Sequence, residues 1–146
     1  MKKQLHVALI LLGMSFIILA GCKKEHGLHT TITLTLLESP ELGVETGTLT
    51  ATGGLTTSGT FVMVIEPVGA DSIHCTTTNT TAEGTFITIL NCSLVTNEGK
   101  WFVESGTGAY KFLQGTGTLL MRFPPDPQVP AGSMGTETQT GIIWFQ

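Results

Sequence analysis

Apolar and polar residues alternate along much of the chain beyond residue 30. In the stretch "TITLTLL" (31–37), Ile32, Leu34 and Leu36 occupy every second position, and threonines fill most of the positions between them. A period of two is typical of a β-strand with one buried face, because successive side chains of a strand point to opposite sides of its sheet. Comparable stretches predict eight strands, over residues 31–37, 47–52, 59–67, 71–81, 84–94, 99–105, 115–123 and 135–146.

Turn residues separate these stretches at the intervals typical of a β-sandwich or barrel. The one long break is "PPDPQVPAGSM" (124–134), in which four of eleven residues are proline, so a strand cannot continue there. We therefore predict one all-β domain of about eight antiparallel strands, closed or nearly closed into a small barrel.

The composition agrees with this prediction and limits the classes of partner that the protein can bind. The 25 threonines of the chain are β-branched and suit a pleated surface that is half exposed to water. Seven Lys and Arg residues stand against eleven Asp and Glu residues, and Arg122 is the only arginine. Because a nucleic-acid interface needs a basic patch, we expect no nucleic-acid partner.

The N-terminus predicts export. Lys2 and Lys3 precede an almost continuous apolar run from Val7 to Ala20, and small residues follow it. This arrangement is typical of a secretory signal peptide, and the run is shorter than the roughly 20 apolar residues of a membrane-spanning helix.

The sequence "LAGC", residues 19–22, resembles the lipobox of bacterial lipoproteins. The resemblance implies a signal peptide over 1–21, cleavage before Cys22, and two or three acyl chains on that cysteine, enough for stable anchoring in membrane lipid. Residues 22–28 would then be a lipidated tether and 29–146 the barrel domain. Lys23 after the cysteine favours the outer membrane if the host is Gram-negative. An ordinary signal peptide with an incidental cysteine is the alternative.

Two further cysteines, Cys75 and Cys92, remain for a disulfide, which is the usual pairing in an exported protein. If the strands on either side of residues 82–85 pair about that turn, Cys75 lies directly opposite Cys92. Directly opposed Cβ atoms are about 4.5–5.5 Å apart, close to what a disulfide requires. We predict this disulfide, and neither a metal site nor a cofactor.

The stretch "SGTGAYKFLQGTGTL" (105–119) invites comparison with phosphate-binding loops. The dinucleotide motif fails because Lys111 stands where its third glycine is needed, and a strand rather than a helix is expected to follow. Gly106 and Gly108 are better explained as a corner of the barrel wall. Tyr110 and Leu113 would then fold back to plug the end of the core.

The same stretch is similar to the "GTG-x-Y/F-x-x-L-x-G-x-G-T" turn of the allene oxide cyclase-like barrels, which include plant cyclases, dirigent proteins and bacterial families of unknown function. The segment "GTETQTG" (135–141) also resembles the final strand of the bacterial members. The resemblance covers about the last 60 residues and implies the barrel fold. The catalytic groups of the plant cyclases have no counterpart here, so we predict no catalytic residue.

Charged residues inside two predicted strands offer the one candidate pocket. Glu104 and Arg122 alternate with large apolar residues, so they face either water or the barrel interior. Inside, they would need pairing and would give an apolar cavity a polar group. The residues of this candidate pocket are Glu104, Arg122, Trp101, Tyr110 and Trp144.

Three functions fit these predictions. The first is a non-catalytic envelope lipoprotein that binds a small apolar ligand or a partner protein, since an eight-stranded barrel leaves room for side chains or one small ligand. The second is a cyclase- or isomerase-type enzyme that uses the barrel interior. The third is a structural or adhesive surface module.

Overall fold

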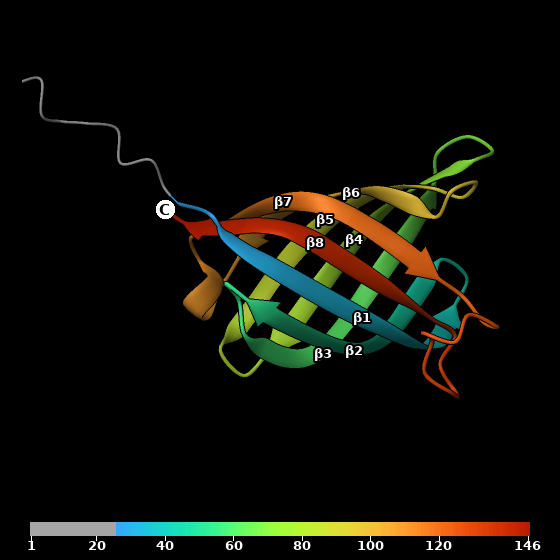
Figure 1. Ribbon diagram of the computed structural model, residues 1–146, viewed down its shortest axis with the longest axis horizontal. Coiled ribbons are helices and arrows are strands. Elements are labelled where there is room, and N and C mark those ends of the chain that lie inside the picture. The colour runs from blue at the N-terminus through green and yellow to red at the C-terminus, as the bar shows by residue number, and fades with distance from the viewer. Residues whose placement is uncertain (1–25) are drawn as a thin grey trace, which may run out of the picture.

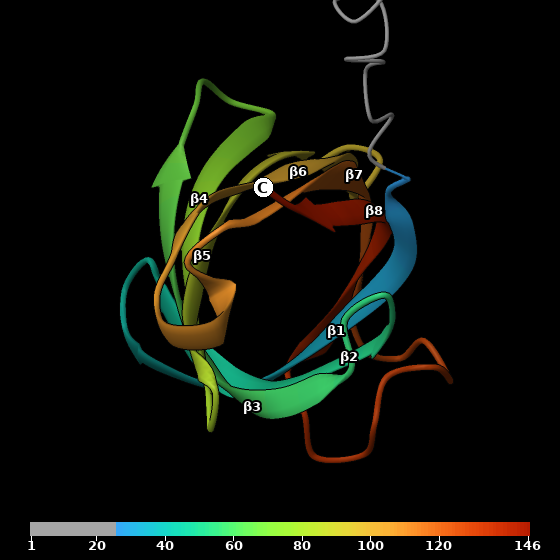
Figure 2. The same ribbon diagram turned by 90° about the vertical axis from the view of Figure 1, so that its left-hand side faces the viewer.

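All eight predicted strands are present in the computed structural model, which describes residues 26–146. They pair antiparallel in chain order, and β8 pairs with β1 to close the barrel, which confirms the predicted fold (Figures 1 and 2). The predicted signal peptide, Cys22 and most of the predicted tether lie outside the described residues. The strands are β1 (Leu28–Glu41), β2 (Val44–Gly53), β3 (Thr57–Pro67), β4 (Ser72–Thr81), β5 (Gly84–Ser93), β6 (Glu98–Gly106), β7 (Leu113–Arg122) and β8 (Gly135–Phe145).

The barrel has two distinct ends, which Figure 1 shows at left and right. The terminal end contains the start of β1, the end of β8 and the turns 54–56, 82–83 and 107–112. At the loop end lie the segments 42–43, 68–71, 94–97 and the proline-rich 123–134. Within residues 26–146, no helix is long and apolar enough to cross a membrane.

The core fills the inside of the barrel. Alternate residues of every strand point inward, and the largest fully buried side chains include Trp101, Phe61, Phe86 and Met63. Their neighbours point to solvent, as the alternating burial along β1 illustrates. Interiors of this kind are packed as densely as molecular crystals, so side chains occupy most of the space inside the barrel.

The glycine-rich stretch is a corner that closes the terminal end, as predicted. Gly108 begins a short 3₁₀ helix, η1 (Gly108–Tyr110), with φ at +59°, a conformation that favours glycine. Tyr110 and Leu113 are both buried beneath this corner. The Tyr110 hydroxyl hydrogen-bonds with Thr81 (2.9 Å) and donates to a carboxylate oxygen of Glu83 (3.2 Å). Hydrogen bonds, foremost the one from Thr81, lower the pKa of Glu83.

The later glycines of this stretch accommodate Trp101. This tryptophan lies directly opposite Gly117 on the neighbouring strand. A Cβ atom at Gly117 would collide with the Trp101 indole and with the carbonyl oxygen of Thr140. The indole nitrogen donates to that same carbonyl oxygen, at 3.3 Å. Glycine is therefore required here for close packing and not for a phosphate.

The predicted register of the β4–β5 hairpin is wrong by two residues. Thr81 pairs with Gly84, so the turn consists of residues 82–83 alone. Within this turn, the Glu83 backbone N–H donates to the Thr81 hydroxyl, and the Glu83 carboxylate accepts from that hydroxyl. Cys75 consequently faces Leu90 instead of Cys92.

The predicted disulfide is therefore absent, and both cysteines are free, buried thiols. A shift of two residues keeps both side chains on the inner face but makes them diagonal neighbours. Diagonal residues lie about 7–8 Å apart, whereas a disulfide needs Cβ atoms within about 3.5–4.5 Å.

Candidate functional site

The structure divides the predicted pocket between the two sides of the barrel wall. Trp101 and Tyr110 point inward and are buried. Glu104 is exposed on the outer wall, Arg122 is partly exposed there, and the half-buried Trp144 alternates with the inward-facing Ile143. The two charged residues therefore take the outward of the two predicted orientations, and the five residues do not line one site.

A polar group that the sequence analysis missed lies inside the barrel. Glu137 and Gln139 of β8 are both completely buried. The amide nitrogen of Gln139 donates to one Glu137 carboxylate oxygen at 2.7 Å, and the other carboxylate oxygen has no partner. Burial raises the pKa of Glu137 to about 7, while the bond from Gln139 opposes this shift. Glu137 is therefore half protonated near neutral pH.

The residue pattern of β8 did not predict that these two side chains point inward. Glu137 and Gln139 alternate with Thr136, Thr138 and Thr140, and both sets look like solvent-facing residues. The following "GIIWF" (141–145) is apolar on both faces, so it does not reveal which set points inward. Ile143 lies on the same side of β8 as Glu137 and Gln139, and its burial in the structure shows that this side faces the interior.

The two thiols lie near this carboxyl group. Burial, together with the charge of Glu137, raises the pKa of Cys75 to about 12 and that of Cys92 to about 11. Because thiolates are the reactive form, neither cysteine of the folded protein should react with a thiol reagent such as DTNB at pH 8. Both should react once the protein is unfolded in guanidinium. Rapid labelling of either thiol in the native protein would contradict this burial.

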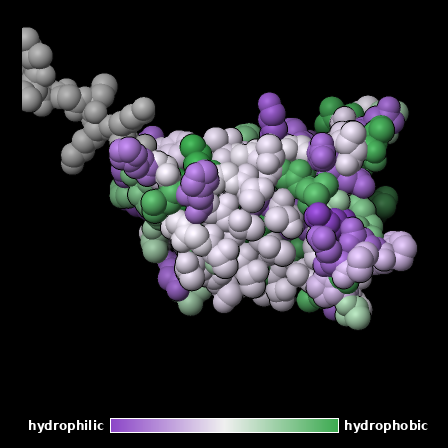
Figure 3. Space-filling view, in the orientation of Figure 1, coloured by the Kyte–Doolittle hydropathy of each residue, from purple (hydrophilic) through white to green (hydrophobic). Residues whose placement is uncertain are grey.

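Threonines cover the outer wall opposite these buried groups. The strand pairing aligns them in rows that run around the barrel, for example Thr118, Thr140, Thr31 and Thr52 on β7, β8, β1 and β2. Neighbouring strands lie about 4.7–4.9 Å apart, so the threonines of each row are close neighbours. Figure 3 shows this face as a broad pale surface with strongly hydrophilic residues mainly toward its ends. We call it the threonine wall, and its members are Thr31, Thr33, Thr35, Thr48, Thr50, Thr52, Thr118, Thr138 and Thr140.

A groove of about 400 Å³ crosses the edge of the threonine wall over β6, β7 and β8. Its volume is within the range of small-molecule sites, about 300–1,000 Å³. Hydroxyl groups line most of its length, Leu120 adds an apolar contact, and charged groups stand at its loop end. The lining side chains are Thr118, Thr138, Thr140, Leu120, Glu98 and Arg122.

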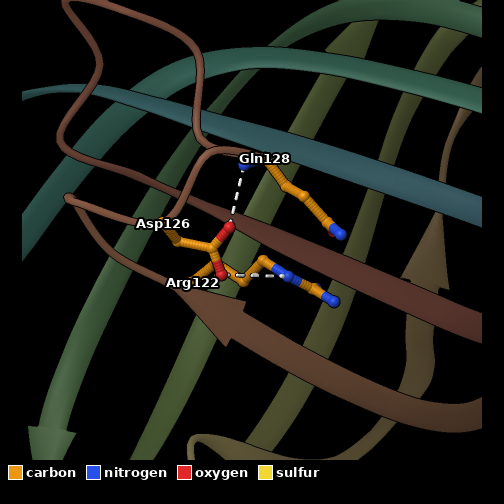
Figure 4. A network of polar contacts seen from close by, with 3 residues as sticks. All are labelled: Arg122, Asp126 and Gln128. Carbon is orange, nitrogen blue, oxygen red and sulfur yellow. Dashed lines mark hydrogen bonds and ion pairs between the residues drawn. The ribbon is translucent and has the colours of Figure 1, made fainter.

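Arg122 is held at the loop end of the groove by the proline-rich segment. Its Nε atom lies 3.5 Å from a carboxylate oxygen of Asp126, and the other oxygen accepts from the backbone N–H of Gln128 at 2.8 Å (Figure 4). The remaining guanidinium nitrogens of Arg122 form no ion pair with any of residues 26–146. An arginine fixed in this way can donate several hydrogen bonds from one plane.

Among residues 26–146, no cluster of three or more His, Cys, Asp or Glu residues is arranged to hold a metal ion. No family model matches the sequence, and neither a curated protein nor a solved structure matches it significantly.

Proposed function

We propose that the protein is a lipid-anchored, non-catalytic envelope protein that binds a neutral, hydroxyl-rich glycan on the outside of its barrel. The groove beside the threonine wall is the observation that carries this proposal. The anchor follows from the lipobox resemblance at Cys22, and the binding site from the groove.

The packed interior favours a site on the outer wall. Trp101, Phe61, Phe86 and Met63 occupy the space that a small apolar ligand or an enzyme substrate would need. Glu137 has the pKa of a general acid or base, but it is completely buried. An adhesive surface module therefore suits the barrel better than the cyclase-type enzyme also considered above.

The chemistry of the groove favours a neutral sugar. Threonine hydroxyls both donate and accept hydrogen bonds, as sugar hydroxyls do. Arg122 supplies donors and Glu98 supplies acceptors at one end, while Leu120 can pack against the C–H face of a sugar ring. Since charges of both signs are present together, the groove does not select for an anionic or a cationic ligand.

The position of the groove is compatible with anchoring through Cys22. The described chain enters the barrel at the terminal end, whereas Glu98 and Arg122 lie at the loop end. A tether attached to β1 would leave the loop end pointing away from the lipid surface. The groove would therefore be accessible to glycans outside the membrane.

The full-length protein, purified in detergent, should bind neutral glycans on an array. Replacing Thr138 and Thr140 together with valine keeps the β-branched shape but removes two hydroxyl groups, each worth about 1 kcal/mol in hydrogen bonding. The affinity for the best-bound glycan, measured by calorimetry, should therefore fall about 10-fold or more. Arg122→Met should cost a further factor of about 10.

Thr78→Val is the matched control, because Thr78 is exposed on the outer wall of β4, away from the groove. This variant should bind the glycan as the parent protein does. If the array shows no neutral glycan bound, or if Thr78→Val weakens binding as much as the groove variants, the proposed function is wrong.

A further inference from the structure

Five buried side-chain atoms in the described part of the chain lack a hydrogen-bond partner, and all are oxygens. Four belong to inward-facing residues that are at most 1% exposed. An unpartnered buried polar atom is destabilising, so four together call for hydrogen-bond donors, supplied by a bound ligand or by water. These four atoms are Glu137 Oε2, Gln139 Oε1, Asn79 Oδ1 and Thr77 Oγ1.

The orientation of both amides is fixed by their neighbours. The Asn79 nitrogen donates to the carbonyl oxygen of Phe86 and to the hydroxyl of Thr88, each at 3.3 Å. The Gln139 nitrogen donates to the Glu137 carboxylate. Because the nitrogens are used in these bonds, it is the acceptor oxygen of each amide that stays free.

The strand register brings the two sets of oxygens to one level. If each residue is followed to its partner on the next strand, the path from Gln139 crosses β7, β6 and β5 and arrives at Ile73 on β4. In the other direction, the same path crosses β1, β2 and β3 and arrives at Glu83, in the turn just beyond the end of β4. Because the strands of a closed barrel are tilted, residues midway between these points lie at the height of Gln139. Those residues are Thr77 and Asn79, so they face Gln139 across the interior.

The electrostatics of the interior agree with this facing arrangement. The charge of Glu137 on β8 acts on the thiol of Cys75 on β4, although four strand positions separate the two strands in the ring. Glu45 of β2 acts on the same thiol, and its own Oε2 atom is also buried without a partner. Glu45 is only partly buried and lies toward the loop end of the barrel.

We propose that these oxygens bind a small protonated amine, either the ammonium ion or the head of a primary amine. Its N–H groups would donate to Gln139, Asn79 and Thr77, and its positive charge would balance the Glu137 carboxylate. In residues 26–146 the one ion pair joins Arg122 to Asp126 on the outer wall, so no side chain neutralises Glu137. The packed core limits the ligand to a small head group. The site is separate from the glycan groove and does not depend on the proposed function.

The binding should depend on pH because only ionised Glu137 attracts a cation. The titratable groups that face it are Glu45, Cys75 and Cys92. The inward faces of β1, β3, β6 and β7 carry uncharged side chains, so nothing there competes for the carboxylate. Burial raises the pKa of Glu137 to about 7, and affinity should therefore increase as pH rises through 7.

Thermal unfolding of the full-length protein tests this site. At pH 8, methylammonium chloride should raise the Tm in a saturable manner, by about 5 °C at concentrations far above Kd, relative to sodium or potassium chloride at equal ionic strength. At pH 5.5 the rise should largely disappear. Glu137→Gln should abolish it at both pH values, whereas the control Glu104→Gln, on the outer wall, should preserve it.

Two results would overturn the proposal. Potassium chloride that stabilises as strongly as methylammonium would assign these oxygens to an alkali-metal site. A methylammonium effect that survives Glu137→Gln would place binding elsewhere. Glu137→Gln removes a buried charge and keeps the side-chain shape, so this variant is expected to fold.

Discussion

Glu137→Gln should stabilise the protein by about 3 kcal/mol at pH 8. The folded-state pKa of Glu137 is about 7, whereas its ordinary value is 4.5. Below pH 4.5 the group is protonated in both the folded and the unfolded state and has no effect. Between pH 4.5 and 7 the unfolded chain releases the proton more readily, so stability falls as pH rises. Above pH 7 both states are ionised and the loss is complete.

Urea unfolding between pH 4 and 8, in buffers free of amines, measures this effect. The difference in unfolding free energy between Glu137→Gln and the parent protein should grow from near zero at pH 4 to its full value by pH 8. Glu104→Gln, which alters an exposed carboxylate, should show no such growth. If the difference in unfolding free energy stayed constant across this pH range, burial would not raise the pKa of Glu137 and the prediction would be wrong.

Trp101→Ala should destabilise the protein by about 3–5 kcal/mol, because it opens a large cavity in the core. Trp101 is 1% exposed and its indole nitrogen donates to the Thr140 carbonyl, which would lose this partner. A loss of that size is comparable to the whole stability of many domains. Trp101→Phe keeps most of the volume and should retain the fold with a smaller loss.

Trp144→Ala is the matched control for this prediction. Trp144 is half-buried on the outer side of β8, so its removal should cost only about 1 kcal/mol. Urea unfolding followed by circular dichroism compares the three variants. Equal losses for Trp101→Ala and Trp144→Ala would contradict the inward placement of Trp101.

The strands and the barrel could be predicted because each strand carries its own signal. Alternation in residues such as Ile32, Leu34 and Leu36 marks one buried face without any knowledge of neighbouring strands. Glycines and prolines mark where strands stop. The glycine-rich corner was also predictable, because Tyr110 and Leu113 are the large residues beside it and need a core.

The register of the β4–β5 hairpin could not be predicted from the same alternating pattern. Strand alternation is unchanged by a shift of two residues, so the pattern cannot distinguish Cys75 facing Cys92 from Cys75 facing Leu90. The shorter turn carries two hydrogen bonds between Thr81 and Glu83, which the alternation of the strands does not reveal. A shift of two residues in this turn is enough to separate the two cysteines.

The two polar sites show why function was harder to predict than fold. Glu137 faces the interior against the usual preference of carboxylates, and its neighbours Thr138 and Thr140 face solvent. From the sequence, all three look alike. The groove also depends on the register of β6, β7 and β8, which lie side by side (Figure 1), and residue alternation does not determine this register.

The barrel packs its core inside, and the proposed glycan site lies on its outer wall. Chemical-shift mapping with the best glycan from the array, on the full-length ¹⁵N-labelled protein in detergent micelles, tests this placement of the ligand. We predict that the perturbed amides cluster around Thr118, Thr138 and Thr140. Perturbations centred instead on inward-facing residues such as Leu34 and Leu90 would place the ligand in the interior and contradict the account.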